Sequence, residues 1–578
     1  MTRQYRTAPN HGREWALVAA LLFAPLVAEA RQSSVSPQSV PAMQEQQPPQ
    51  PPAGTVWPPQ KSDTEQLKSE DQTPSGHQPA PPDKPKDEKH ITPEEAKQLF
   101  GLVDELIKFS SGETGLEIKS DVKRQMTSRA AVESYLKQKF DEDEGAKRLQ
   151  RGEIVLEKFG LLDRDFALKP FLLALLKEQI EAYYDSKSKT VYMLDWVDVD
   201  EQKPVLAHEL THALQDQRTD LEKWGDQTPD DVSLNYREDT DHLAKDEMDT
   251  AREAVTEGQA TAVMMDYLLK PMGKSLVKDP EVMDLLKQGM QGSEDSPVLA
   301  RAPLLLSESL LFPYREGLSF EQDLWMDKGQ TAAFAGALDQ PPTSSWEIIN
   351  PREYEAHHLP AVPLLPDIHP LVDKLYKPYD IGQVGQLDLH ILAEIFGGDD
   401  AARDLTSAWD GGVYWAGQRL SARTPAEQAS TKSISLLYLS VWKNAASAQS
   451  FAALYANELG RKYSNVKPDT AAEHTAPASA TAGTEEQVFT TNEGPVVITT
   501  RGAQVFVAES FDLDLARKLA ALILDAQGIG EMRMANRTPP AARSIQPAGA
   551  PLTADWVRFF ADCGVMKAAV RAAMQSSK

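Results

Sequence analysis

The chain has 578 residues, a formal net charge of -26 and 41% hydrophobic residues. This acidity argues against nucleic acid and anionic membrane surfaces as partners, because both carry negative charge. Cys563 is the one cysteine, which excludes an intramolecular disulfide and a cysteine-based metal site. Any metal ion must therefore be bound by histidine or carboxylate side chains.

Residues 1–30 have the pattern of a secretory signal peptide. Three arginines precede the apolar run WALVAALLFAPLVA, and Ala28-Glu29-Ala30 supplies a cleavage site. A membrane anchor is the alternative, but this run contains Pro25 and is shorter than the roughly 20 residues that span a bilayer. We therefore expect a secreted or periplasmic bacterial protein with no transmembrane segment in the mature chain.

Residues 31–90 are rich in proline, glutamine and charge, which predicts a disordered tether. Order is expected to resume where Thr92 caps a helix that has Pro93 in its first turn. From there to about Ile180 the pattern is helical, with little indication of strands. Two short β-prone runs, 183–184 and 190–194, then flank a polar turn and predict a hairpin.

A helix is expected from about Pro204, followed by an acidic loop over 226–242 and a second helix over 246–269. Residues 303–370 mix helix with irregular, proline-rich connections such as LFPYREG. Beyond them, two successive groups of strands, each followed by a helix, indicate an α+β region and suggest an internal duplication.

The fold class expected is α+β. We expect a mostly helical zincin-like metallopeptidase domain over 91–370, with a small hairpin or sheet before the motif helix. A smaller α+β domain over 371–540 and a C-terminal tail and helix over 541–578 complete the predicted organisation.

The stretch VLAHELTHALQDQ contains the motif H-E-x-x-H. On a helix, His208 and His212 lie on one face one turn apart, so both imidazoles can reach one cation. Glu209 is rotated by about 100° from His208, which suits a base acting on water beside the metal better than a third ligand. The alternative without a metal is two buried histidines and a surface glutamate. The helix is apolar on most sides, however, so all three groups are expected to be buried, and burying them without partners is costly.

The second helix offers a third ligand, because Glu257 lies within its inward-facing stripe of small and apolar residues. Gly258 and Ala254 in the same stripe permit close approach of a neighbouring helix. Glu253 lies one turn earlier at the margin of the stripe and is the alternative ligand. Glu257 is favoured by its position in the stripe and by the glycine that follows it.

These residues carry a resemblance to a known family. H-E-L-T-H at 208–212, followed by E-G-Q-A at 257–260, resembles the gluzincins, zinc metallopeptidases of the thermolysin and M1-aminopeptidase type. The resemblance implies zinc ligands at His208, His212 and Glu257, with Glu209 as general base, and a hairpin edge along which substrate peptides lie. The wider run is similar to bacterial secreted members whose substrates are not evident. The interval 213–256 between His212 and Glu257 is longer than in many gluzincins. In thermolysin-like members an acidic residue follows the ligand glutamate four positions later, and an alignment on that pattern makes Glu253 the ligand.

The function expected is zinc-dependent hydrolysis of peptide bonds in a peptide or protein substrate. The oxyanion needs an electrophilic partner, and the candidates are Tyr314, His242, His357 and His358, none of which is fixed by spacing. The alternative function is a non-catalytic binding protein of the cell envelope that keeps the metallopeptidase fold. A structural protein with a metal-free buried helix is the third possibility.

Overall fold

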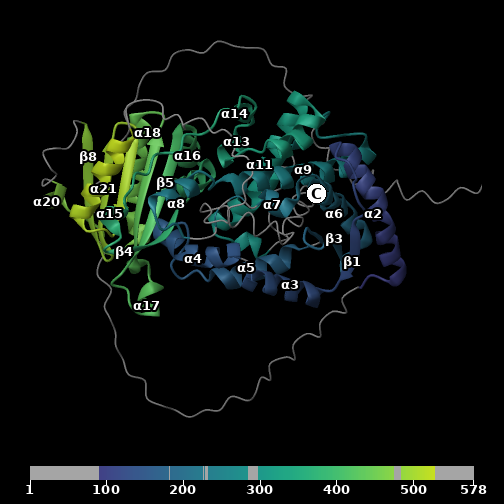
Figure 1. Ribbon diagram of the computed structural model, residues 1–578, viewed down its shortest axis with the longest axis horizontal. Coiled ribbons are helices and arrows are strands. Elements are labelled where there is room, and N and C mark those ends of the chain that lie inside the picture. The colour runs from purple at the N-terminus through teal and green to yellow at the C-terminus, as the bar shows by residue number, and fades with distance from the viewer. Residues whose placement is uncertain are drawn as a thin grey trace, which may run out of the picture. The chain divides into compact units, whose positions relative to one another are not determined.

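The computed structural model describes residues 90–527, apart from residues 143, 181, 226, 228, 230–231, 281, 284–296 and 474–482. The signal peptide expected over 1–30, the tether over 31–90 and the tail over 541–578 therefore lie outside the described residues, His90 excepted. The described chain contains both helices and strands, in agreement with the α+β class (Figure 1). No helix in these residues has the length and apolar character that crossing a membrane requires.

The N-terminal part of the described chain is mostly helical, and it begins as the sequence predicts. The Thr92 hydroxyl accepts the Glu95 N–H at 3.2 Å, and the Glu95 carboxylate accepts the Thr92 N–H at 2.8 Å, forming a capping box. Helices dominate as far as Ile180, as expected, and one short strand lies between the first two helices. The elements are α2 (Pro93–Thr114), β1 (Lys123–Thr127), α3 (Arg129–Glu142), α4 (Glu144–Phe159) and α5 (Leu168–Gln179).

The predicted hairpin is present as β2 (Ala182–Asp185) and β3 (Thr190–Leu194), which pair antiparallel. Strand β1 pairs with β3 in parallel, so the order in this three-stranded sheet is β1-β3-β2. The polar strand β1 was missed because its partner lies more than sixty residues later in the chain. Strand β2 consequently forms one edge of the sheet.

The motif helix is α6 (Val199–Thr219), which begins five residues before the predicted start at Pro204. The Asp198 carboxylate caps it by accepting the Asp200 N–H at 3.0 Å. Pro204 lies inside the helix, in its second turn, and its nitrogen cannot donate an intrahelical hydrogen bond. The predicted start was late because proline is common in the first turn of a helix.

Two expectations for the following segment are corrected. The acidic stretch 226–242 is not all loop, since α8 (Tyr236–Leu243) begins within it behind the cap Asn235. LFPYREG is not an irregular connection but part of α11 (Leu304–Lys328), which contains Pro313. The other elements of this segment are α7 (Leu221–Gly225), α9 (Met248–Leu269), η3 (Lys270–Met272), η4 (Leu299–Arg301), η5 (Ala332–Gly336), α12 (Ala337–Asp339), α13 (Ser345–Ile349), α14 (Pro351–Glu355) and α15 (His369–Val372).

Both predicted groups of strands followed by a helix are present, and they share one seven-stranded sheet in the order β4-β5-β6-β10-β9-β8-β7. All its neighbouring strands pair antiparallel where pairing is described. The elements are β4 (Tyr376–Gln383), α16 (Gln386–Ala408), β5 (Trp409–Arg419), α17 (Pro425–Gln428), η6 (Thr431–Ser433), β6 (Ile434–Trp442), α18 (Ala445–Asn457), α19 (Leu459–Lys462), β7 (Lys467–Pro468), α20 (Thr470–Glu473), β8 (Thr484–Thr491), β9 (Gly494–Arg501), β10 (Gln504–Glu509) and α21 (Leu513–Ala526).

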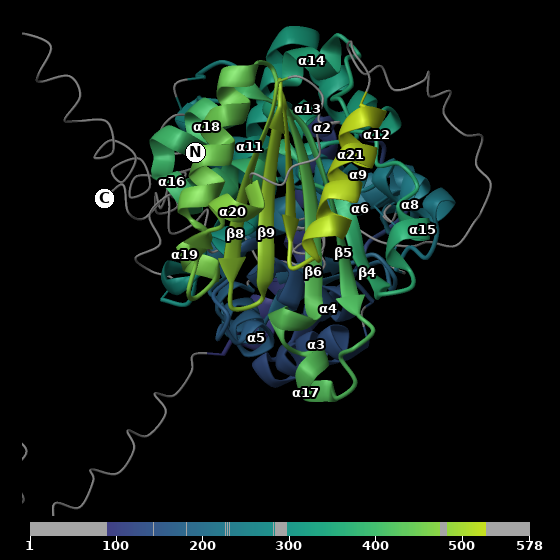
Figure 2. The same cartoon turned by 90° about the vertical axis from the view of Figure 1, so that its left-hand side faces the viewer.

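The two faces of this sheet are covered differently. Helix α18 packs Phe451 and Tyr455 into one hydrophobic cluster, while α21 packs Leu519 and Ile523 into another on the opposite face. Figure 2 shows α21 lying across the near face of the sheet. Because the two terminal helices cover opposite faces, the two groups do not repeat one packing arrangement.

The larger hydrophobic cluster includes residues from Leu99 to Val507 and therefore joins α6, α9 and one face of the seven-stranded sheet. Helix α4 also contacts β6 directly. The described residues after Lys89 belong to one compact unit. The domain boundary that the sequence places at residue 370 stays a prediction.

Candidate metal centre

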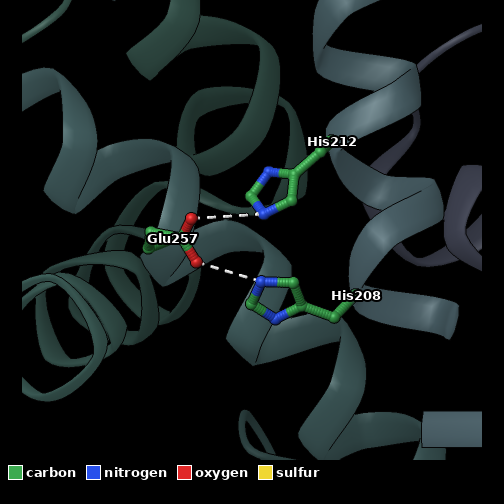
Figure 3. Close-up of side chains that lie close together, drawn as sticks. All are labelled: His208, His212 and Glu257. Carbon is green, nitrogen blue, oxygen red and sulfur yellow. Dashed lines mark hydrogen bonds and ion pairs between the residues drawn. The ribbon is translucent and has the colours of Figure 1, made fainter. Parts of the chain in front are cut away.

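Two adjacent helices bring three potential metal ligands together. His208 and His212 lie one turn apart on α6, and Glu257 lies on α9. Figure 3 shows the Glu257 carboxylate between the two imidazoles, with one oxygen directed at each ring. Within the described part of the chain, these residues are the one group of histidine, cysteine or carboxylate side chains whose candidate ligand atoms all lie within 4.8 Å of one another.

The distances suit a single metal ion. Glu257 Oε2 lies 3.0 Å from His208 Nε2, and Glu257 Oε1 lies 3.3 Å from His212 Nε2. A tetrahedral ion with bonds of about 2.0–2.2 Å keeps neighbouring ligand atoms about 3.3 Å apart. Two imidazoles and one carboxylate also form a donor set that leaves a fourth position open. This buried group can therefore hold a metal ion with little rearrangement.

The group is almost closed to solvent. The side chain of His208 is 1% exposed and that of Glu257 is 5% exposed, whereas that of His212 is 13% exposed. His212 is therefore the least covered of the three side chains.

Burial and charge act together on this group. Burial alone would raise the pKa of Glu257, but the adjacent His212 and His208 outweigh it and hold that pKa well below its ordinary range. Burial would lower the pKa of His212, but the Glu257 carboxylate raises it above the ordinary 6.5. These shifts favour the charged forms of both Glu257 and His212.

The chain was compared with protein-family models, with curated proteins and with solved structures, and none of these comparisons found a match. The site is therefore inferred from the residues of this chain alone. Three observations support it: the spacing in the sequence, the convergence of the side chains and their burial.

Glu209, the predicted base, extends from α6 towards the hairpin. Its side chain is buried, and its Oε2 accepts the backbone N–H of Tyr184 at 2.7 Å. Tyr184 belongs to β2, the edge strand of the three-stranded sheet. Since β2 is an edge strand of the described sheet, this hydrogen bond ties Glu209 to the sheet edge.

Tyr314 is the oxyanion candidate that lies against the ligand group. Its ring stacks beside that of His208 with the centroids 6.3 Å apart, and its hydroxyl interacts with Glu257. Burial and then the Glu257 carboxylate raise the pKa of Tyr314 well above its ordinary value. The hydroxyl therefore stays protonated and able to donate.

Close packing of two helices places Tyr314. A Cβ on Gly258 of α9 would lie 2.3 Å from the Gly317 carbonyl oxygen, and a Cβ on Gly317 of α11 would lie 2.1 Å from the Ala254 carbonyl oxygen. Only glycine fits at either position. The close approach expected for Gly258 and Ala254 is confirmed, and it brings Tyr314, one turn before Gly317, to Glu257.

The other oxyanion candidates contact different groups. His242 is buried, and its Nε2 lies 3.2 Å from Asp246 Oδ1. His357 is exposed, and His358 is exposed with its Nδ1 2.7 Å from Glu353 Oε2. Glu253, the alternative ligand, lies one turn before Glu257 and is partly buried.

Two features of the site were missed from the sequence. The first is the Tyr184 N–H, which no side-chain pattern can reveal. The second is Gln215, whose Oε1 lies 2.8 Å from His212 Nδ1. Its spacing of three residues after a ligand histidine places it beside that histidine on a helix, so this signal was present in the sequence.

Proposed function

We propose that the protein is an exported zinc-dependent metallopeptidase with a zincin-like arrangement, and that it hydrolyses peptide bonds in peptides or proteins. The observation that carries the proposal is the convergence of His208, His212 and Glu257, with Glu209 on the same helix turn. Two imidazoles and a carboxylate with an open fourth position form the donor set of catalytic rather than structural zinc sites.

Zinc bound at such a site supplies Lewis-acid polarisation of the scissile carbonyl and lowers the pKa of a water molecule towards about 7. The residues of the chain perform the remaining steps. In this proposal Glu209 accepts the proton from that water and delivers it to the leaving amine. The hydrogen bond from the Tyr184 N–H orients its carboxylate for this role.

Two further groups suit the same reaction. The edge strand β2 lies beside Glu209, and an extended substrate peptide would lie along this edge, where the Tyr184 N–H is already bonded to Glu209. Tyr314 retains its proton and lies beside His208, which suits donation to a developing oxyanion. These roles agree with the resemblance to gluzincins, in which the hairpin edge lines the substrate cleft.

The second candidate function is a non-catalytic binding protein of the cell envelope. The burial of all three ligand side chains favours it, because a substrate carbonyl needs access to the fourth position. Retention of Glu209 favours the enzyme, since a scaffold that only binds has no use for a buried carboxylate at this position.

The test compares wild type with Glu209→Gln in a peptide-library digest and in zinc analysis. We expect Glu209→Gln to keep about one zinc per chain and to lose hydrolysis by roughly 10²–10⁴-fold, because a general base contributes that much. Glu201→Gln is the matched control, since Glu201 lies on the same helix but is exposed. Full hydrolysis by Glu209→Gln contradicts the proposal, and a zinc-loaded wild type that cleaves no peptide supports the binding protein.

A further inference from the structure

Two buried glutamines connect the helices that carry the metal ligands. Gln215 lies on α6 three residues after His212, and Gln259 lies on α9 two residues after Glu257. Both are fully buried, and Gln215 Nε2 lies 3.0 Å from Gln259 Oε1. Since buried amides need partners for their donors and acceptors, their other contacts determine how each amide is oriented.

Backbone carbonyls fix the orientation of both amides. Gln259 Nε2 lies 3.0 Å from the carbonyl oxygens of Ala333 and Phe334, and Gln215 Nε2 lies 3.0 Å from that of Thr256. Carbonyl oxygens only accept, so the nitrogen of each amide must face them and neither amide can be turned around. The oxygen of Gln215 is then directed away from these carbonyls and can only accept.

This orientation determines which ring nitrogen of His212 carries hydrogen. Gln215 Oε1 lies 2.8 Å from His212 Nδ1, and an acceptor at that distance requires Nδ1–H. In the neutral imidazole the lone pair is then on Nε2. Nε2 is the nitrogen that lies 3.3 Å from Glu257 Oε1 and faces the candidate metal position.

The two carbonyl groups that accept from Gln259 belong to a π-helical turn. Ala333 and Phe334 belong to the π-helical turn η5 (Ala332–Gly336), a rare geometry that is frequently found at functional sites. Glu321 lies next to Gln259 and is fully buried, and burial raises its pKa well above the ordinary value. Burial therefore disfavours a negative charge on this carboxyl group beside the two amides.

We propose that Gln215 and Gln259 are positioning residues that hold His212 with hydrogen on Nδ1 and so direct its Nε2 to the metal ion. We call this chain of hydrogen bonds the relay. The π-helical turn holds one end of it, and His212 lies at the other end. The proposal rests on the metal-binding part of the proposed function and does not depend on peptidase activity.

The test is the zinc dissociation constant of the full-length chain, measured by competition with a chelator. We expect Gln215→Met to weaken zinc binding by roughly 10–100-fold, as loss of a partner behind a metal ligand does, and Gln259→Met to have a smaller effect in the same direction. Gln215→Glu keeps an acceptor for Nδ1–H, so it should bind zinc more tightly than Gln215→Met.

Gln202→Met is the matched control. Gln202 is also fully buried on α6, but its amide bonds to the backbone of Leu194 and Val197. This variant should bind zinc as wild type does, even where it lowers stability. A second readout is ¹⁵N NMR of histidine-labelled, zinc-loaded protein, which should show Nδ1–H at His212 in wild type and an altered resonance in Gln215→Met.

Each outcome separates the relay from the proposed function. Wild-type zinc affinity in both Gln215→Met and Gln259→Met, or equal weakening in Gln202→Met, overturns the relay. If wild type binds zinc but cleaves no peptide, the peptidase is refuted while the affinity comparison still tests the relay. If wild type binds no zinc, the metal centre and the relay are refuted together.

Discussion

Glu509 and Glu257 are both buried carboxylates, but the chain balances their charges in different ways. Glu509, at the end of β10, contacts the Lys462 ammonium and accepts hydrogen bonds from the hydroxyls of Tyr455 and Tyr463. Lys462 and Glu509 are both buried, and their side chains are 0% exposed. The charge of this carboxylate is thus balanced by a lysine cation.

Glu257 lies instead between two histidines, and a histidine carries positive charge only while it holds a proton. The positive charge at this site is therefore exchangeable, either a proton on His212 or a metal ion in its place. The Glu509 cluster thus suits structural stability, whereas the Glu257 cluster suits ion binding.

Glu247 shows a third way to bury a carboxylate. It is 1% exposed, and Ser345 Oγ donates to its Oε1 at 2.7 Å. A Cβ on Gly385 would lie 1.7 Å from that oxygen, so the carboxyl fills space that only glycine leaves open. Burial, and then the nearby Asp388, raise the pKa of Glu247 to about 8. Here the carboxyl keeps its own proton.

The largest expected effect concerns this third carboxyl. Its folded-state pKa of about 8 exceeds the ordinary 4.5, so its contribution to stability is full below pH 4.5 and is lost as pH rises through 8. At about 1.4 kcal/mol for each pH unit between these two values, the loss is up to about 5 kcal/mol. Glu247→Gln should therefore gain stability over wild type between pH 5 and pH 9, measured by urea unfolding. The control is Glu105→Gln, at an exposed glutamate. The interpretation is contradicted if Glu247→Gln changes the unfolding free energy by the same amount at pH 5 and at pH 9.

Removal of the lysine cation should have the next largest effect. Lys462→Met removes the ammonium group that contacts the buried Glu509, which costs about 3–5 kcal/mol of unfolding free energy. Zinc content should stay at the wild-type value, because the candidate metal ligands are other residues. Lys443→Met, at an exposed lysine, is the control for denaturant unfolding. A destabilisation no larger than that of the control, or loss of zinc from folded Lys462→Met, is the result that would refute this distinction.

The exchangeable charge should appear in the pH dependence of zinc binding. Zinc must displace the proton on His212, whose pKa is raised above 6.5, so the affinity should fall about tenfold per pH unit below that pKa. In the metal-free protein the sign is opposite: the stability that this proton contributes is full below pH 6.5 and is lost as pH rises through the folded-state pKa. Chelator competition between about pH 5.5 and 8.5 measures the affinity across this range, and a flat profile is the contrary result.

The sequence was sufficient to predict the parts of the site that helical periodicity determines. The four-residue spacing of His208 and His212 and the place of Glu257 in an inward stripe both follow from one helix at a time. The hairpin was equally local, since its turn joins strands that are adjacent in the chain. The catalytic role of Glu209 and the identity of the metal stay predictions.

Features that depend on contacts between distant segments could not be predicted. Lys158 and Glu493 form a buried ion pair although 335 residues separate them, and no local pattern marks either as a partner. Tyr314 reaches Glu257 because α9 and α11 cross at Gly258 and Gly317, which requires the packing of two helices to be known. Pro313 suggested a loop at the same place, and tertiary packing overrode this local preference.

The metal centre is tested most directly by the metal content of the full-length chain, purified without chelators and measured by mass spectrometry beside His212→Ala. We expect about one zinc per chain in wild type and a small fraction of that in His212→Ala, because the variant lacks one of three ligands. Wild type without stoichiometric metal, or His212→Ala with the wild-type amount, would contradict the assignment of His208, His212 and Glu257 as a metal centre.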